Sequence, residues 1–503
     1  MEDPDDGDDE EKSFLPDRSQ GARDITDDYT PEDDRQVLRK LDRRLVLFMA
    51  LLYMMSFLDR SNIGNARVAG MMQDLHLSAS QYEWLLTAFY INYILFEWMT
   101  LLYRVFPPHV YISICVLSWG VLASLQSIAT SFVPLLILRA LLGVGEAAFG
   151  PGVPFYLSFF FRRNELAMRT GLFISAAPLA TSFASTLAWV LMKVGQGGPV
   201  APWRLLFLVE GFPSVFVAVF AWHFIPDDPS TAKFLSPRER KVAAWRVAVE
   251  RDRDAKPSQG QTGSGVSRGL NVKQVLQTLA DPKCYLTALM FFSCNVAFSS
   301  LPVFLPTIIK EIGYESLTAQ ALSAPPYLVS FLVVLLTSHI SDRLQSRSPL
   351  LIMHALSAAF GYALIALAGS LRWPPFWRYI GIYPACAGFF SAITLIITWT
   401  INNQESESGR GTGMAILNVV GQCGPLLGTR LYPDTDAPYY VRGMSVCAVF
   451  MVLVAVLAMG LRFMLSRENA RRAKEKGSAG NGEDAVPLFG RGERRQETFL
   501  YFL

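Results

Sequence analysis

Four of the ionisable residues inside apolar stretches of the sequence are the most informative. Asp59 and Arg60 are adjacent in LVLFMALLYMMSFLDRSNIGNAR, and Arg139 and Glu146 are seven residues apart in LLILRALLGVGEAAFGPG. A charge at the centre of a membrane costs roughly 2.5 kcal/mol or more, so each such residue is a functional candidate. Seven residues make almost two helical turns, so Arg139 and Glu146 are predicted to share one helix face, about 10 Å apart.

Two acids and two arginines that face one cavity would suit proton-coupled transport of an anion. A guanidinium is always charged, and its fork of donors matches a carboxylate. A desolvated carboxylate can take up and release a proton near neutral pH. Asp59 and Arg139 are predicted to lie at about the same depth, in the outer half of the membrane. The alternative is that these residues form static ion pairs that lock helices together.

Further polar and aromatic residues in apolar stretches are weaker candidates. Asn295 and Asn418 are predicted to line the cavity from the second half of the chain, or else to hydrogen-bond between helices. Tyr90 and Trp399 are predicted to line the cavity too, although aromatic residues as often serve packing.

The elements that would position these residues are membrane-spanning helices. Of the 503 residues 51% are hydrophobic and 17% charged, whereas soluble domains average about 25% charged residues. About 20 apolar residues span a hydrocarbon core of about 30 Å. On that measure the predicted spans are 44–65, 82–102, 109–129, 133–155, 169–192, 204–225, 284–305, 319–341, 349–370, 377–401, 411–431 and 441–464.

These spans predict an all-α membrane protein with twelve transmembrane helices in two six-helix halves, the plan of the major facilitator fold. The central loop contains the linker KPSQGQTGSG and the stretch SPRERKVAAWRVAVERD, which is typical of a surface helix. The predicted units are an acidic disordered tail (1–43), a first half (44–225), a central loop (226–283), a second half (284–464) and a tail (465–503).

Basic residues before the first span, in the central loop and after the last span place both termini on the cytoplasmic side. The acidic start is the wrong order for a signal peptide. We expect a multi-pass protein of the plasma membrane, and a monomer.

Composition and motifs argue against several other functions. A net charge of +2 argues against nucleic-acid binding. The six cysteines lie in or beside apolar segments without CxxC spacing, so no metal site is indicated. The sequence shows no P-loop, no HExxH and no credible Ser–His–Asp arrangement, so neither an enzyme nor a cofactor is predicted. Without an ATP site, the driving force must be a gradient.

Several segments resemble the anion:cation symporter family of the major facilitator superfamily, above all its fungal allantoate, nicotinate and pantothenate permease branch. The resemblance covers roughly residues 36–465. It implies that Asp59 and Glu146 are protonatable and that Arg60 and Arg139 are carboxylate ligands. The segments are FLDRSNIGNAR, AFYINYILFE, RALLGVGEAAFGPGVPFYLSFFFRRNELAMR, WRLLFLVEG, PDDPSTAKFLSPRER and YPDTDAPYYVRG.

The chain departs from the family pattern at several places. Phe96-Glu97 in the second span is not followed by the usual Pro and Asn, and the superfamily loop motif Gly-x-x-x-Asp-Arg-x-Gly-Arg is nearly absent after it. The second copy of that motif survives as Ser338…Asp342-Arg343, which looks like a cytoplasmic gate or hinge pair.

The function implied by these features is proton-coupled symport of a small organic anion, a carboxylate-bearing nutrient, vitamin or metabolite, by alternating access. Two alternatives stay open: an exporter of a secondary metabolite, and a nutrient sensor that binds its ligand without transporting it.

Overall fold

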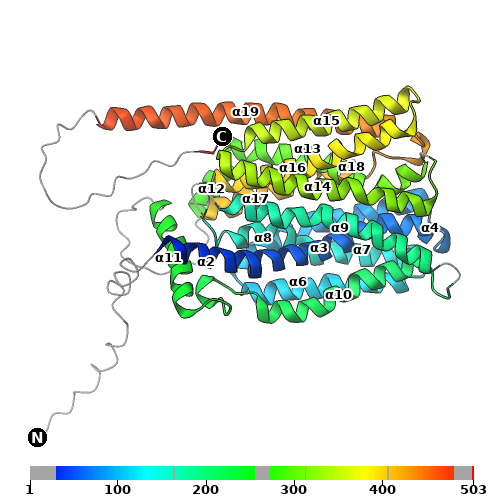
Figure 1. The fold of residues 1–503 in the computed structure, drawn as a ribbon, viewed down its shortest axis with the longest axis horizontal. Helices are drawn as coiled ribbons and strands as arrows, with labels where there is room; N and C mark the ends of the chain where they lie inside the picture. The colour runs from blue at the N-terminus through cyan, green and yellow to red at the C-terminus, as the bar shows by residue number, and fades with distance from the viewer. Residues whose placement is uncertain are drawn as a thin grey trace, which may run out of the picture.

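A computed structural model describes residues 30–162, 165–195, 198–254, 272–311, 313–404, 407–480 and 501–502. Within these ranges no β-strand occurs, and the long helices run side by side along one axis (Figure 1). The predicted all-α architecture is therefore confirmed.

The first half begins with α2 (Pro31–Leu41) and a π-helical turn (Asp42–Val46), which lead directly into the first pass. A capping box between Ser78 and Gln81 starts the second pass, and proline in the first turn starts the third and the sixth. The passes are α3 (Leu47–Val68), α5 (Ala79–Phe96) continued by the 3-10 segment η2 (Glu97–Arg104), α6 (Pro108–Leu125), α7 (Phe132–Ala147) with α8 (Phe149–Leu157), α9 (Leu166–Val194) and α10 (Pro202–Phe224). The short helix α4 (Met71–Asp74) connects the first two passes.

The second half follows the helices α11 (Pro237–Asp254) and α12 (Val272–Leu279). The predicted surface helix thus forms as α11, whereas the linker KPSQGQTGSG lies outside the described residues. The remaining passes are α13 (Pro282–Glu311), α14 (Ser316–Leu344), α15 (Ser348–Ser370), α16 (Pro375–Asn402), α17 (Glu407–Gly421) with α18 (Gly424–Gly428), and α19 (Val441–Gly480).

Nine of these passes are long and apolar enough to cross a membrane by length and composition, as judged over the described ranges. The other three predicted spans are formed by less regular or more polar helices. In α3 the pair Asp59–Arg60 lowers the hydropathy, the second pass changes to 3-10 geometry at Glu97, and α17 ends after 15 residues. Together they complete the twelve predicted spans.

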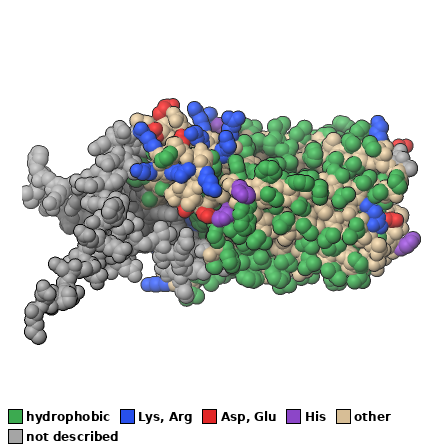
Figure 2. All heavy atoms as spheres, turned by 90° about the horizontal axis from the view of Figure 1, so that it is seen from below, with side chains coloured by type: hydrophobic (Ala, Val, Ile, Leu, Met, Phe, Trp, Pro, Cys, Tyr) green, Lys and Arg blue, Asp and Glu red, His purple; other side chains and the backbone are tan. Residues whose placement is uncertain are grey.

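A belt of hydrophobic side chains covers the middle of the bundle on the face that Figure 2 shows. Lys, Arg, Asp and Glu side chains gather at the end that carries α2, α11 and α12. Large apolar residues of this belt, such as Phe216, Val219 and Phe220 of α10, are exposed in the isolated chain. An exposed apolar surface of this kind suits contact with lipid. We call the charged end the α2–α11 end and the other the α4 end.

The predicted disordered tail needs a correction for its last residues. Residues 1–29 lie outside the described ranges, but Pro31–Leu41 form α2. A capping box between Thr30 and Asp33 starts this helix. Ion pairs then fasten it to α11: Lys40 Nζ lies 2.7 Å from Glu239 Oε1, and Asp33 pairs with Arg238 at 3.2 Å. The tail after the last span is also partly ordered, since α19 extends to Gly480.

The two halves approach closely at both ends of the bundle. Near the α4 end, a Cβ on Gly64 of α3 would lie 2.5 Å from the carbonyl oxygen of Val303 in α13. Near the α2–α11 end, a Cβ on Gly171 of α9 would lie 2.6 Å from Cβ of Ser338 in α14. Glycine is therefore required at both crossings, because any side chain would push the helices apart.

Candidate functional site

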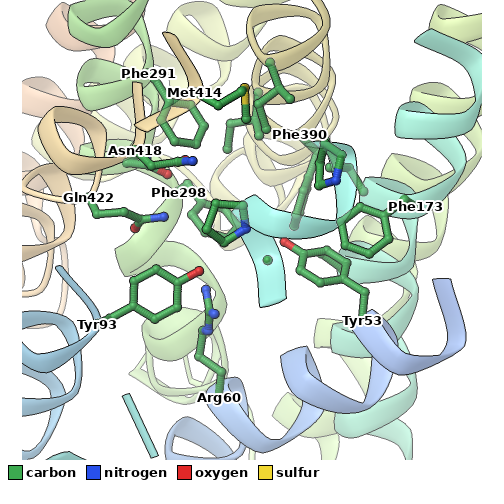
Figure 3. A pocket seen from close by; sticks show the side chains of 18 residues that line it. Tyr53, Arg60, Tyr93, Phe173, Phe291, Phe298, Phe390, Met414, Asn418 and Gln422 are labelled. Atoms are coloured by element: carbon green, nitrogen blue, oxygen red, sulfur yellow. The ribbon is translucent and has the colours of Figure 1, made fainter. Parts of the chain in front are cut away.

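A central cavity of about 50 Å³ lies between the two halves. Arg60 and the hydroxyl groups of Tyr53 and Tyr93 point into it from the first half (Figure 3). Its wall is otherwise mostly apolar. The lining residues are Tyr53, Arg60, Tyr93, Gly150, Pro151, Pro154, Phe173, Ile174 and Ala177 of the first half, and Phe291, Asn295, Phe298, Phe390, Ile393, Ile397, Met414, Asn418 and Gln422 of the second.

An ion pair between Arg60 and Glu146 stands at the edge of this cavity. Arg60 donates to Glu146 Oε2 through Nη2 at 2.8 Å and through Nε at 3.0 Å. Ser56 Oγ donates to the same oxygen at 3.0 Å. Glu146 is completely buried, and its second oxygen, Oε1, accepts no hydrogen bond within the described residues. The carboxylate therefore depends on Arg60 for most of its stabilisation, because a buried charge is costly unless it is paired.

Aromatic rings surround the guanidinium of Arg60. Its Cζ lies 4.8 Å from the ring centroid of Tyr93, 5.2 Å from that of Phe89 and 5.9 Å from that of Phe57. A cation is attracted to the faces of such rings. The rings thus help to hold the guanidinium of Arg60 beside the cavity, in addition to its hydrogen bonds with Glu146.

Arg139, predicted as a carboxylate ligand, contacts backbone carbonyl groups in this structure, and its role as a ligand stays a prediction. Its Nη2 donates to the carbonyl oxygen of Arg60 at 3.2 Å, and its Nη1 lies 3.5 Å from that of Asp59. Arg139 is not among the residues that line the cavity. In this structure its guanidinium instead ties α7 to the backbone of α3, at the level of the ion pair.

Asp59 lies outside the cavity as well. Its Oδ2 accepts a hydrogen bond of 3.3 Å from Ser214 Oγ in α10, whereas Arg60 reaches Glu146 in α7. Successive residues of a helix are about 100° apart, so Asp59 and Arg60 cannot face the same way. The predicted cluster of four residues around one cavity is therefore divided: Arg60 lines the cavity and binds Glu146, and Asp59 faces the α3–α10 interface.

The second half contributes three amide side chains to the cavity. Asn295 donates from Nδ2 to the carbonyl oxygen of Gly421 at 3.2 Å, so it joins α13 to the end of α17 as well. Asn418 and Gln422 point toward the cavity opposite Arg60 (Figure 3). The predicted positions of Asn295 and Asn418 at the cavity agree with the structure, and both alternatives for Asn295, lining and interhelical bonding, are realised together.

The two predicted aromatic lining residues lie elsewhere. Tyr90 is buried but does not line the cavity, and its place on α5 is taken by Tyr93, one turn further along. Trp399 is completely buried and donates from Nε1 to the carbonyl oxygen of Phe502 at 2.8 Å. Tyr53 was not predicted, although it precedes Arg60 by seven residues, the same spacing that relates Arg139 to Glu146.

Asp342 of the predicted gate pair Asp342–Arg343 forms its ion pair with another arginine. Asp342 binds Arg347, with Arg347 Nη2 2.8 Å from Asp342 Oδ1, while the side chain of Arg343 is exposed. The other oxygen of Asp342 accepts a hydrogen bond of 2.8 Å from the backbone N–H of Met168, in the first turn of α9. Asp342 thereby joins the two halves at the α2–α11 end. A gating role for Asp342 and Arg343 stays a prediction.

Comparison of the sequence with known proteins identifies the family of this chain. The family model of the Major Facilitator Superfamily matches residues 49–429. The chain belongs to the Major Facilitator Superfamily. It is 30% identical over 467 residues to the MFS transporter prlL of Fungal sp. (strain NRRL 50135), covering 91% of each chain. It is 28% identical to the high-affinity nicotinic acid transporter of Saccharomyces cerevisiae, covering 87% of this chain and 79% of that one.

Solved major facilitator structures share the fold. The proton:xylose symporter XylE bound to 6-bromo-6-deoxy-D-glucose superposes with a TM-score of 0.66 at 14% identity, over 82% of this chain and 95% of that one. A bacterial homolog of the human lysosomal transporter Spinster gives a TM-score of 0.57 at 17% identity, over 83% and 96%. The predicted fold, superfamily and fungal branch are confirmed. This major facilitator is a multi-pass membrane protein and a secondary transporter of a small molecule, not an enzyme.

Proposed function

We propose that this major facilitator is a proton-coupled symporter of a small organic anion. The observation that carries the proposal is the buried ion pair between Arg60 and Glu146 beside the cavity. Protonation of Glu146 would cancel its charge and so weaken its hold on Arg60. The guanidinium could then turn its donors to the carboxylate of a solute. Without a solute anion, the buried charge of Arg60 would need an ionised Glu146 as its partner. Binding of the anion to Arg60 is thereby coupled to binding of a proton to Glu146.

The walls of the cavity favour a particular class of anion. Apart from Arg60 and a few hydroxyl and amide groups, the lining is apolar and largely aromatic. A carboxylate attached to a flat or apolar body would therefore suit it. The yeast relative is a transporter of nicotinic acid, which has this chemistry, and nicotinate is a reasonable first probe.

The proposal includes a place and a mode of movement. We infer a monomer in the plasma membrane with the α2–α11 end in the cytoplasm, because basic residues such as Arg39, Lys40, Arg43 and Arg44 lie at that end. The halves 44–225 and 284–464 would rock against each other. The tail 1–43, the central loop 226–283 and the tail 465–503 would not belong to either moving half.

Uptake measurements in proteoliposomes test this function. Radiolabelled nicotinate and a panel of other small carboxylates are offered with and without an inward proton gradient, to the wild type and to Glu146→Gln and Arg60→Gln. We expect gradient-driven accumulation in the wild type, its loss in Glu146→Gln, and loss of saturable binding in Arg60→Gln. Accumulation that still follows the proton gradient in Glu146→Gln would refute the coupling.

A further inference from the structure

Two residues far along the chain, Tyr501 and Phe502, dock against the α2–α11 end of the second half. Tyr501 is only 7% exposed although it belongs to no helix. The residues that bind this segment come from α13, α19 and the C-terminal end of α16 with its cap, which are distant in sequence. We call them the peptide site; they are Lys283, Trp399, Asn403, Asn469 and Arg472.

Two asparagine side chains of the peptide site bind the backbone of the segment. Asn469 accepts from the N–H of Tyr501 and donates to its carbonyl oxygen, both at 2.9 Å. Asn403 does the same for Phe502, accepting at 2.8 Å and donating at 3.2 Å. An amide side chain that pairs with both backbone groups of one residue reproduces the pairing of a β-ladder. Such contacts recognise an extended peptide whatever its side chains.

Two cations of the peptide site add a preference for tyrosine. Lys283 Nζ and Arg472 Nη2 each donate to the hydroxyl oxygen of Tyr501 at 2.9 Å. The same cations lie 4.4 Å and 4.6 Å from the centroid of its ring. The phenol therefore offers both cations an acceptor oxygen and a π-face, in addition to their ion pairs with Asp281 and Glu468. Backbone and side-chain contacts together define the ligand as an extended peptide with a tyrosine.

The docked segment also reaches the contact that closes this end of the bundle. The guanidinium of Arg347 lies 5.5 Å from the ring centroid of Phe502. Arg347 is fully buried and pairs with Asp342, whose other oxygen binds the Met168 N–H in α9 of the first half. A chain of three contacts thus leads from Phe502 to the opposite half.

We propose that the peptide site is a regulatory site whose occupant is the segment Tyr501–Phe502 of this chain. When the segment is bound, the ring of Phe502 keeps Arg347 against Asp342, and Asp342 stays on the first turn of α9. Occupancy therefore favours closure of α9 against α14 at the α2–α11 end. Release of the segment loosens that closure. Binding is intramolecular, so it does not depend on protein concentration.

Hydrogen exchange of the full-length protein in detergent, followed by mass spectrometry, reads both parts of the proposal. The amides of Tyr501 and Phe502 report occupancy, because each donates to an asparagine oxygen. The amide of Met168 reports closure: the first N–H groups of a helix have no acceptor within it, so its protection depends on Asp342.

Two variants remove the docking from opposite sides. Asn403→Ala/Asn469→Ala changes the site, whereas Tyr501→Ala/Phe502→Ala changes only the occupant and leaves the helical bundle untouched. Both should make the Met168 amide exchange roughly tenfold faster, an effect of the size expected for one or two lost hydrogen bonds. Asn403→Ala/Asn469→Ala should also remove protection from residues 501–502. The matched control is Arg467→Ala, an exposed arginine of α19 that contacts Phe463 instead, and it should change neither signal.

Two results would overturn the proposal. Residues 501–502 of the wild type that exchange as fast as a free peptide would show that the site is empty in solution. If residues 501–502 lose their protection in both double variants and the exchange of the Met168 amide stays unchanged, docking does not control closure. If Asn403→Ala/Asn469→Ala fails to fold, Tyr501→Ala/Phe502→Ala gives the answer alone.

Discussion

At the scale of single residues, the two buried arginines should respond differently to substitution. Arg60 faces the cavity, so Arg60→Lys keeps the charge but loses the forked donor geometry, and KM for the carboxylate should rise about tenfold or more. Arg139 donates to backbone carbonyls of α3, so Arg139→Gln should lower the melting temperature, because a lost hydrogen bond from a charged donor costs about 1.5–3 kcal/mol. Uptake kinetics and thermal unfolding of both variants check the contrast. A larger change of KM in Arg139→Gln than in Arg60→Lys would reverse the assignment.

The two acids of the predicted cluster, Asp59 and Glu146, should also differ in how their substitution affects anion binding. Asp59 bonds to Ser214 away from the cavity, so Asp59→Asn should leave the affinity for the carboxylate within about twofold. Glu146→Gln removes the ion pair, so it should bind the anion with an affinity that no longer varies with pH. Equilibrium binding at several pH values measures both. If Asp59→Asn alone abolishes the pH dependence, the proton site lies at the α3–α10 interface.

Helix geometry decides which contacts of the candidate site could be predicted from the sequence. Arg60 and Glu146 stand out because charges are rare in apolar spans, but their pairing was not predicted, because the estimated depths matched Asp59 with Arg139 instead. Asp59 does not share the cavity with Arg60 because adjacent helical residues diverge by about 100°, and a proton-site role for Asp59 stays a prediction. Tyr53 was overlooked although a spacing of seven residues connects it with Arg60. The contact of Trp399 with Phe502 has no local signature, since the two residues are 103 positions apart.

At the scale of elements, two glycines permit the close helix crossings at opposite ends of the bundle. Gly64→Ala would place a Cβ 2.5 Å from the Val303 carbonyl, so the α4 end should open. Gly171→Ala would press on Ser338 and should open the α2–α11 end instead. Alanine usually favours a helix by up to about 1 kcal/mol over glycine, so these effects would come from the crossing and not from the helix itself.

Spin labels at Gln73 and Arg372 measure the separation of the halves at the α4 end, because these exposed residues belong to different halves. Cys423, which is exposed, is replaced by serine in the same background. Gly64→Ala should shift the distance distribution to longer values, and Gly171→Ala should not. Equal distributions in both variants would mean that the crossings do not control access.

The α2–α11 assembly should depend on Arg246 of α11. This side chain is fully buried and pairs with Asp34 of α2 and, at 2.6 Å, with Glu165 just before α9. Arg246→Ala leaves two acids without their shared partner, so the cost should be about 3 kcal/mol or more. Arg238→Ala, which removes an exposed pair, should cost at most about 1 kcal/mol. Melting temperatures in detergent compare the two. Equal shifts would show that α11 does not brace the bundle.

The elements themselves were largely predictable. Runs of about 20 apolar residues locate nearly every pass, because the thickness of the hydrocarbon core fixes their length. Helix α2 was missed because the acidic composition of the first 43 residues masks the cap at Thr30. Its placement depends on the burial of Val37 and Leu41 and on ion pairs to α11, a partner some 200 residues away, which a local pattern cannot reveal.

At the scale of the whole molecule, one small cavity lies between two halves that touch at both ends. The Gly64–Val303 contact closes the α4 end, and the Asp342–Met168 contact joins the halves at the other. Opening one contact at a time would give a solute access to the cavity from one side of the membrane at a time. The ion pair of Arg60 and Glu146 lies between the two closures, where a change of charge would act on both halves.

The exchange of partners at Arg60 is the centre of this account, and proton uptake on anion binding tests it most directly. Purified protein in weakly buffered detergent, with a pH indicator, receives a carboxylate at a pH at which that carboxylate is ionised. We predict that the wild type takes up close to one proton for each anion bound, and that Glu146→Gln binds the anion without taking up a proton. Equal proton uptake by both proteins, or none by the wild type at saturation, would contradict the account.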